Sequence, residues 1–145
     1  QAENSAPLVD GKIIKNPSTV ATAIRIGNPA SSDLAKEAVN DSQGEFLKVS
    51  DEEIISAQSL IAKHEGIFCE PASAASFAGL LKKINNGLDV KNKKIVCILT
   101  GNGLKDPENA QKYLKSKIIK TSSSSESIKK AILSGSSTNI FKRMF

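Results

Sequence analysis

The chain has 145 residues, of which 39% are hydrophobic, 24% charged and 4% aromatic, and its formal net charge is +5. No apolar stretch approaches the roughly 20 residues that a membrane-spanning helix requires, so we expect no membrane role. The lysines are spread along the chain with few aromatic or arginine residues between them, which argues against nucleic-acid binding. The length is that of about one domain with its own core.

The start of the chain and its two cysteines both bear on where the protein is located. Residues 1–8 contain no basic or apolar part of a signal peptide and no initiator methionine, so we expect a cut end here. Cys69 and Cys97 are far apart and each lies in an apolar run, which favours reduced, buried thiols over a disulfide or a metal site. A cytoplasmic location is therefore predicted.

The first part of the chain is predicted to be irregular and then helical. Three prolines within residues 1–30 prevent long regular elements there. The apolar spacing predicts a helix over 32–41, and a short strand is expected at 46–49.

Two further helices carry clear terminal signals. Ser50 and Glu53 have the spacing of a capping box, which opens a helix that runs to about His64 and stops at Gly66. A second helix is predicted over 73–85, with apolar residues at intervals of three and four positions.

The strongest predicted strand covers 94–99, an unbroken apolar run of the kind found in the middle of a parallel sheet, covered on both faces. A last unit is expected to contain a helix at 108–114, a strand at 118–120, a serine-rich turn at 122–125 and a helix at 127–133. Residues 134–145 lack a period and are expected to be disordered. The alternation of helices and strands predicts an α/β layer architecture.

Three segments contain candidate site residues. Thr100-Gly-Asn-Gly at 100–103 follows the predicted central strand, where ligands of α/β sheets gather; a ligand site and a plain tight turn both fit it. In EGIFCEPASAAS at 65–76, small residues such as Ser73 open a helix, and Glu70 either caps or pairs locally or lines a cofactor pocket. In TAIRIGNPAS at 22–31, Arg25 is either a member of a buried ion pair or an anion ligand.

Other chemistry has little support in the sequence. His64, the only histidine, is expected at the surface in the last turn of its helix. No cluster of His, Cys, Asp and Glu has metal-ligand spacing, and no motif of a nucleophilic hydrolase is present. No catalytic or metal-binding residue is therefore assigned.

The three segments TAIRIGNPAS, EGIFCEPASAAS and CILTGNGLKDP (97–107) together resemble the C-terminal half of the threonine synthase family. These are fold-type-II pyridoxal-phosphate enzymes of the tryptophan synthase β group. The resemblance covers residues 1–133 and implies part of a catalytic domain with a three-layer fold, in which helices flank a mostly parallel sheet and the N-terminal half is absent. Residues 134–145 would be an irregular tail.

The resemblance also implies a cofactor, a reaction and a partner. Thr100 matches the family's hydroxyl residue at the pyridine nitrogen of pyridoxal 5'-phosphate. The implied reaction converts O-phosphohomoserine and water to threonine and phosphate, in a homodimer when full length. The family's Schiff-base lysine lies in a motif close to Phe-Lys-Asp-Arg, and neither this motif nor the glycine-rich phosphate loop occurs in the sequence. We therefore expect the chain alone to be inactive.

Two alternatives to a threonine synthase remain open. The first is a threonine or serine dehydratase, because those enzymes also have a Glu-Pro-x-x-Ala stretch and a hydroxyl at the pyridine nitrogen. The second, from a different class, is a non-catalytic remnant or an interaction module. An isolated piece of an enzyme should expose apolar surface, whereas a true module should be monomeric and unfold cooperatively.

Overall fold

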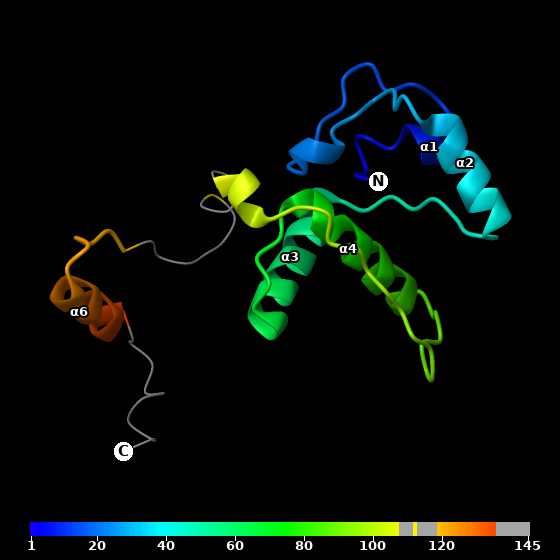
Figure 1. Ribbon diagram of the computed structural model, residues 1–145. Helices are drawn as coiled ribbons and strands as arrows, with labels where there is room; N and C mark the ends of the chain where they lie inside the picture. The colour runs from blue at the N-terminus through cyan, green and yellow to red at the C-terminus, as the bar shows by residue number, and fades with distance from the viewer. Residues whose placement is uncertain (108–111, 113–118, 136–145) are drawn as a thin grey trace. The chain divides into compact units, whose positions relative to one another are not determined.

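The computed structural model describes residues 1–107, 112 and 119–135, and the chain divides into two compact units, 1–114 and 115–145 (Figure 1). The helices of the first unit are α1 (Pro7–Asp10), η1 (Thr22–Ile24), α2 (Ser32–Asp41), α3 (Asp51–Glu65), α4 (Pro71–Asn85) and η2 (Gly103–Lys105). The second unit contains α6 (Ser125–Gly135). No helix in these residues is long and apolar enough to cross a membrane.

The core of the first unit lies where α3 and α4 pack on each other, the most extensive contact between its elements. Apolar side chains at three- and four-residue intervals supply the facing sides of the two helices. Residues from the N-terminal segment and from the chain before α3 complete this core. Its buried members are Ala2, Ala21, Val49, Ile54, Ala57, Ile61, Cys69, Ala74 and Ala78.

The predicted ends of α3 are confirmed. The Glu53 amide donates to Ser50 Oγ at 3.2 Å, and the Ser50 amide donates to Glu53 Oε2 at 2.7 Å, which forms both halves of the capping box. Gly66 ends the helix in the left-handed conformation with φ 68°. The helix predicted at 32–41 forms with the same bounds, and α4 begins two residues before the predicted start at residue 73.

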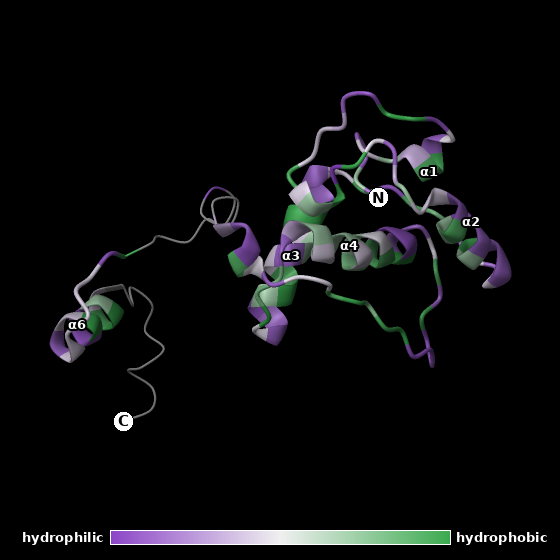
Figure 2. Cartoon of the chain, turned by 45° about the horizontal axis from the view of Figure 1, so that its top comes forward, coloured by the Kyte–Doolittle hydropathy of each residue, from purple (hydrophilic) through white to green (hydrophobic). Residues whose placement is uncertain are grey.

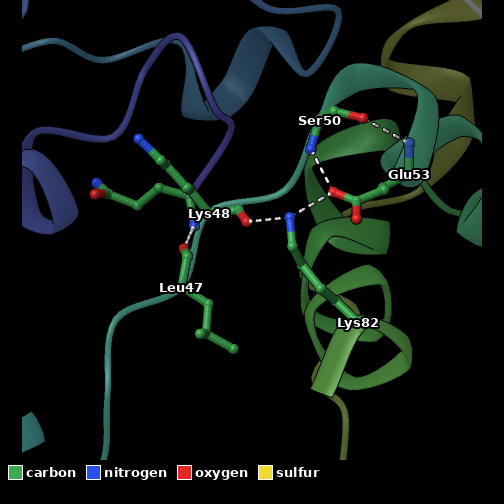
Figure 3. A network of polar contacts seen from close by, with 6 residues as sticks. Leu47, Lys48, Ser50, Glu53 and Lys82 are labelled. Atoms are coloured by element: carbon green, nitrogen blue, oxygen red, sulfur yellow. Dashed lines mark hydrogen bonds and ion pairs between the residues drawn. The ribbon is translucent and has the colours of Figure 1, made fainter. Parts of the chain in front are cut away.

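A network of polar contacts joins α3, α4 and the extended chain at 45–49 (Figure 3). The Lys82 ammonium donates to Glu53 Oε2 and to the Lys48 carbonyl, both at 3.1 Å. The side chains of Glu53 and Lys82 are each more than a third exposed, so this ion pair fixes geometry more than it stabilises the fold. One carboxylate thus caps α3 and anchors α4.

The described residues form no β-strand, so the strand predictions at 46–49 and 94–99 are wrong as stated, and the three-layer sheet is not seen. Isolated bridges are the only β pairings within residues 1–107, 112 and 119–135, one of them between Ala2 and Val49. A strand needs a partner for its backbone groups, and within the described residues nothing forms a ladder with either segment.

The segment 94–99 is also not buried on both faces as predicted. Cys97 and Leu99 are half-buried, and Leu99 packs on the core. Val96 and Ile98, which alternate with them, are 85% and 71% exposed. Figure 2 shows the hydrophobic colouring of this segment as it runs back from the end of α4. One apolar face is therefore open.

The second unit bears out one predicted element. α6 contains the helix predicted at 127–133 and extends it at both ends, so that Ser134 and Gly135 are helical and not part of an irregular tail. The serine-rich stretch before it is exposed and leads into the helix. Three other predictions fall wholly or partly outside the described residues. They are most of the helix predicted at 108–114, the start of the strand predicted at 118–120, and the tail at 136–145. The domain boundary at residue 133 stays a prediction.

Candidate functional site

The chain segments 68–70 and 101–103 run antiparallel to each other and place Thr100 beside the start of α4. The Glu70 amide donates to the Gly101 carbonyl at 3.0 Å, and the Gly103 amide donates to the Phe68 carbonyl at 3.0 Å. Two hydrogen bonds in this pattern fix the relative position of the two segments. Thr100 is thereby held at the N-terminal end of a 15-residue helix.

Ser73, in the first turn of α4, is the centre of a small hydrogen-bonded cluster. The Gly101 amide donates to Ser73 Oγ at 2.7 Å, and Ser73 Oγ lies 3.1 Å from Thr100 Oγ1. Ser73 Oγ also lies 3.3 Å from the Gly101 carbonyl oxygen, to which it can donate. Ser73 is 2% exposed, whereas Thr100 is exposed. The cluster thus presents one hydroxyl to its surroundings and buries the other.

Glu70 is buried beside this cluster. It is the N-cap residue of α4, it is 7% exposed, and its side chain makes no capping hydrogen bond. Among the described residues no hydrogen bond or ion pair to its carboxylate is present. The carboxylate lies against the α carbon of Gly101. In the described residues the Glu70 side chain therefore neither caps α4 nor pairs with a cation, and its role in lining a cofactor pocket stays a prediction.

The two glycines of the 100–103 segment leave room for neighbouring side chains. A β carbon at Gly101 would overlap the Glu70 carboxylate, and one at Gly103 would lie 2.5 Å from Cζ of Phe68. Both neighbours come from the antiparallel segment 68–70. The groups that approach the two glycines closely are thus side chains of the chain itself.

The structure brings the three candidate segments together. Ser73 and Thr100 join the second to the third, and the Thr22 hydroxyl donates to Asp106 Oδ2 at 3.1 Å, which joins the first to the third. Sequence reasoning missed Asp106 and gave Ser73 a role only through its place near a helix start. A hydrogen bond between residues that are distant in sequence produces no local pattern from which it could be predicted.

Arg25 and His64 lie outside this cluster. Arg25 is exposed, and the described residues include no ion pair with it, so the buried ion pair considered for Arg25 is not formed. His64 is exposed in the last turn of α3, as predicted. In the part of the chain that the structure describes, no group of His, Cys, Asp and Glu side chains is suited to a metal ion.

Both cysteines are free, Cys69 buried and Cys97 half-buried, which confirms the expectation of thiols. Burial raises the pKa of the Cys69 thiol, and its own backbone offsets this only in part. A protonated buried thiol is a packing residue and not a nucleophile.

A separate groove of about 480 Å³ runs between α4 and the chain at 45–49. Apolar side chains dominate its walls, and its charged residues Glu45 and Lys83 pair with each other at 2.5 Å. It therefore offers little polar chemistry. The cluster of Ser73, Thr100 and Gly101 is the better candidate for a reactive ligand.

The hydrogen-bonding groups of the cluster define what it can bind. An exposed hydroxyl with a buried hydroxyl behind it is a neutral donor or acceptor, suited to the ring nitrogen of a heteroaromatic ligand. No lysine takes part in the hydrogen bonds of this cluster among the described residues. The residues present thus fit one edge of such a ligand.

Comparison with known proteins gives the class of the chain. The sequence model of the family described as "Pyridoxal-phosphate dependent enzyme" matches residues 1–101. The chain therefore belongs to this family of pyridoxal-phosphate-dependent, fold-type-II enzymes, as the sequence motifs predicted.

Within this family, the chain is similar to proteins that share one name. The chain is 55% identical over 116 residues to "Threonine synthase" of Mycobacterium tuberculosis (strain ATCC 25618 / H37Rv), an alignment that covers 80% of this chain and 32% of that protein. It is 54% identical over 110 residues to "Threonine synthase" of Halalkalibacterium halodurans, covering 76% and 31%. For "Threonine synthase" of Methanocaldococcus jannaschii the identity is 50% over 118 residues, covering 76% and 29%. The chain spans about a third of the length of these relatives.

Proposed function

We propose that this chain is the C-terminal portion of a threonine synthase, which converts O-phosphohomoserine and water to threonine and phosphate. Its membership of the pyridoxal-phosphate family and its identity of 50–55% to proteins named threonine synthase support the proposal. The main structural observation in its support is the exposed Thr100 hydroxyl, which is hydrogen-bonded to the buried Ser73 at the start of α4.

In this proposal Thr100 contacts the pyridine nitrogen of the cofactor. When bound, pyridoxal phosphate supplies an electron sink for carbanions formed on an amino-acid substrate. A hydroxyl at the ring nitrogen donates a neutral hydrogen bond, whereas a carboxylate would hold the ring as a pyridinium. Thr100 therefore orients the ring and leaves its nitrogen largely unprotonated.

The remaining chemistry falls to residues that this sequence does not supply. The lysine motif and the phosphate loop of the family do not occur among the 145 residues, so the chain by itself is expected to be inactive. The proposal includes a homodimer of the full-length protein. It also places the protein in the cytoplasm, in keeping with the free thiols of Cys69 and Cys97.

The test is an assay of the full-length protein with pyridoxal phosphate and O-phosphohomoserine. Release of phosphate in equal amount to threonine is the expected result. Threonine and serine serve as competing substrates, and formation of 2-oxo acids from them without turnover of O-phosphohomoserine would identify a dehydratase instead. Thr100→Val, which keeps the shape and removes the hydroxyl, should weaken cofactor binding.

A further inference from the structure

We propose that Ser73 is a positioning residue, which holds the Thr100 hydroxyl as a hydrogen-bond donor toward the ring nitrogen of the cofactor. This inference rests on the proposed function, in which Thr100 makes that contact. It concerns which of the two hydroxyls carries the proton between them, because only one of the two arrangements leaves Thr100 able to donate outward.

The hydrogen bonds around Ser73 allow two arrangements. Ser73 Oγ accepts from the Gly101 amide at 2.7 Å in both. In the first, Thr100 donates to Ser73 and Ser73 donates to the Gly101 carbonyl, so that Thr100 can only accept from a ligand. In the second, Ser73 donates to Thr100 at 3.1 Å, and the Thr100 proton is directed away from Ser73.

The second arrangement leaves no buried group without a partner. The Gly101 carbonyl already accepts from the Glu70 amide at 3.0 Å, so it does not depend on the Ser73 proton. The Gly101 amide is satisfied by Ser73 Oγ in either case. A ligand that accepts a hydrogen bond at Thr100 therefore selects the second arrangement at little cost.

The direction of this chain of donors matters for the strength of the contact. Gly101 N–H donates to Ser73, Ser73 donates to Thr100, and Thr100 donates to the ring nitrogen. Successive hydrogen bonds of this kind polarise one another. Since Ser73 is 2% exposed and lies in the first turn of α4, its position is fixed by the helix, and it limits the rotation of the exposed Thr100 hydroxyl.

Ser76 offers a matched control one turn along the same helix. Its hydroxyl donates to the Ser73 carbonyl at 3.1 Å and lies 3.3 Å from the Ile98 carbonyl, and it makes no hydrogen bond with Thr100 in the described residues. Ser76→Ala thus removes a hydroxyl from the same element without affecting the proposed chain of donors.

The experiment measures the dissociation constant of pyridoxal phosphate by equilibrium dialysis, and the absorption spectrum of the bound cofactor, in the full-length protein. Ser73→Ala should weaken binding about fivefold, the worth of one hydrogen bond, and shift the spectrum, while Ser76→Ala changes neither. Thr100→Val should weaken binding at least as much. Adding Ser73→Ala to Thr100→Val should then change nothing further, whereas adding it to Thr100→Ser, which keeps a hydroxyl, should still weaken binding.

The outcomes separate this inference from the function on which it rests. If Thr100→Val binds the cofactor like the wild type, the assigned contact of Thr100 is wrong, and the role of Ser73 falls with it. If Thr100→Val weakens binding and Ser73→Ala does not, only the role of Ser73 is wrong. An equal effect of Ser73→Ala with and without the Thr100 hydroxyl would mean that Ser73 supports the fold alone. Should Ser73→Ala fail to fold, Ser73→Cys keeps a weaker donor, and wild-type affinity in it would overturn the inference.

Discussion

The carboxylate of Glu70 lies so close to the α carbon of Gly101 that a β carbon at position 101 would overlap it. The two residues are also joined through the backbone, since the Glu70 amide donates to the Gly101 carbonyl at 3.0 Å. Gly101 does not have a positive φ. The glycine is thus required by the space that Glu70 fills and not by its backbone conformation.

Replacing Gly101 with alanine should lower the free energy of unfolding by about 1–3 kcal/mol, because the 7% exposed Glu70 side chain has to leave its buried place. Urea denaturation of the full-length protein measures the change. In a Glu70→Ala background the same replacement should cost clearly less. An equal cost in both backgrounds would show that Glu70 is not the obstacle.

Gly79 provides the contrasting case in α4. A β carbon there would have Leu47 Cδ1 at 3.8 Å as its nearest neighbour, which is ordinary contact. Gly79→Ala should therefore raise the free energy of unfolding by up to about 1 kcal/mol, since alanine favours a helix over glycine. A loss of stability would show that the groove beside α4 leaves no room for a methyl group.

Ser50→Ala tests the capping box of α3. The substitution removes the acceptor of the Glu53 amide at 3.2 Å and should lower the free energy of unfolding by about 1 kcal/mol. Ser56→Ala is the control, since Ser56 is exposed within α3 and makes no hydrogen bond through its side chain in the described residues. A similar loss in both variants would contradict a specific role of the cap.

The helices could be predicted from the sequence because their signals are local. Ser50 and Glu53 are three residues apart, and Gly66 follows directly on the last turn, so the bounds of α3 depend on neighbours in the chain. The 94–99 segment depends on partners instead. Its apolar composition led to the prediction of a buried strand, which the structure does not show, because burial of Val96 requires chain that lies beside it in space.

The site was predictable only in part for the same reason. Thr100 could be singled out because it follows an apolar run, and the motif around it is specific to a family. Its hydrogen bond to Ser73 joins residues 27 positions apart, and that of Thr22 to Asp106 joins residues 84 apart. Such pairs follow from the packing of α4 against the 100–103 segment, which no local pattern contains.

Glu53 should make the free energy of unfolding depend on pH in the acid range. Burial alone would raise its pKa, but the Ser50 amide and the Lys82 ammonium lower it more, so the pKa lies below that of an ordinary glutamate. A lowered pKa contributes stability above the unfolded value of about 4.3, which is lost as the pH falls through the folded value.

Glu53→Gln keeps a side chain that can complete the capping box and removes the charge. Between about pH 6 and about pH 3, its free energy of unfolding should fall less than that of the wild type. Urea titrations at several pH values measure this. Glu37→Gln, at an exposed position of α2 without an ion pair in the described residues, should retain the wild-type dependence. Parallel pH curves for all three proteins would exclude Glu53 as a source of the dependence.

The open face of the 94–99 segment predicts self-association of the 145-residue chain. Val96 and Ile98 are 85% and 71% exposed and adjacent on one face, and exposed apolar surface of this kind drives association. Lysine at both positions should reduce binding of a hydrophobic dye and shift sedimentation toward the monomer. The control places the same two charges at Ile13 and Leu34, which are 64% and 67% exposed but lie apart in the sequence. An equal reduction of self-association in both variants would show that net charge is the cause. A reduction only in the first variant would locate the association at this face, because charge added elsewhere leaves the apolar contact intact.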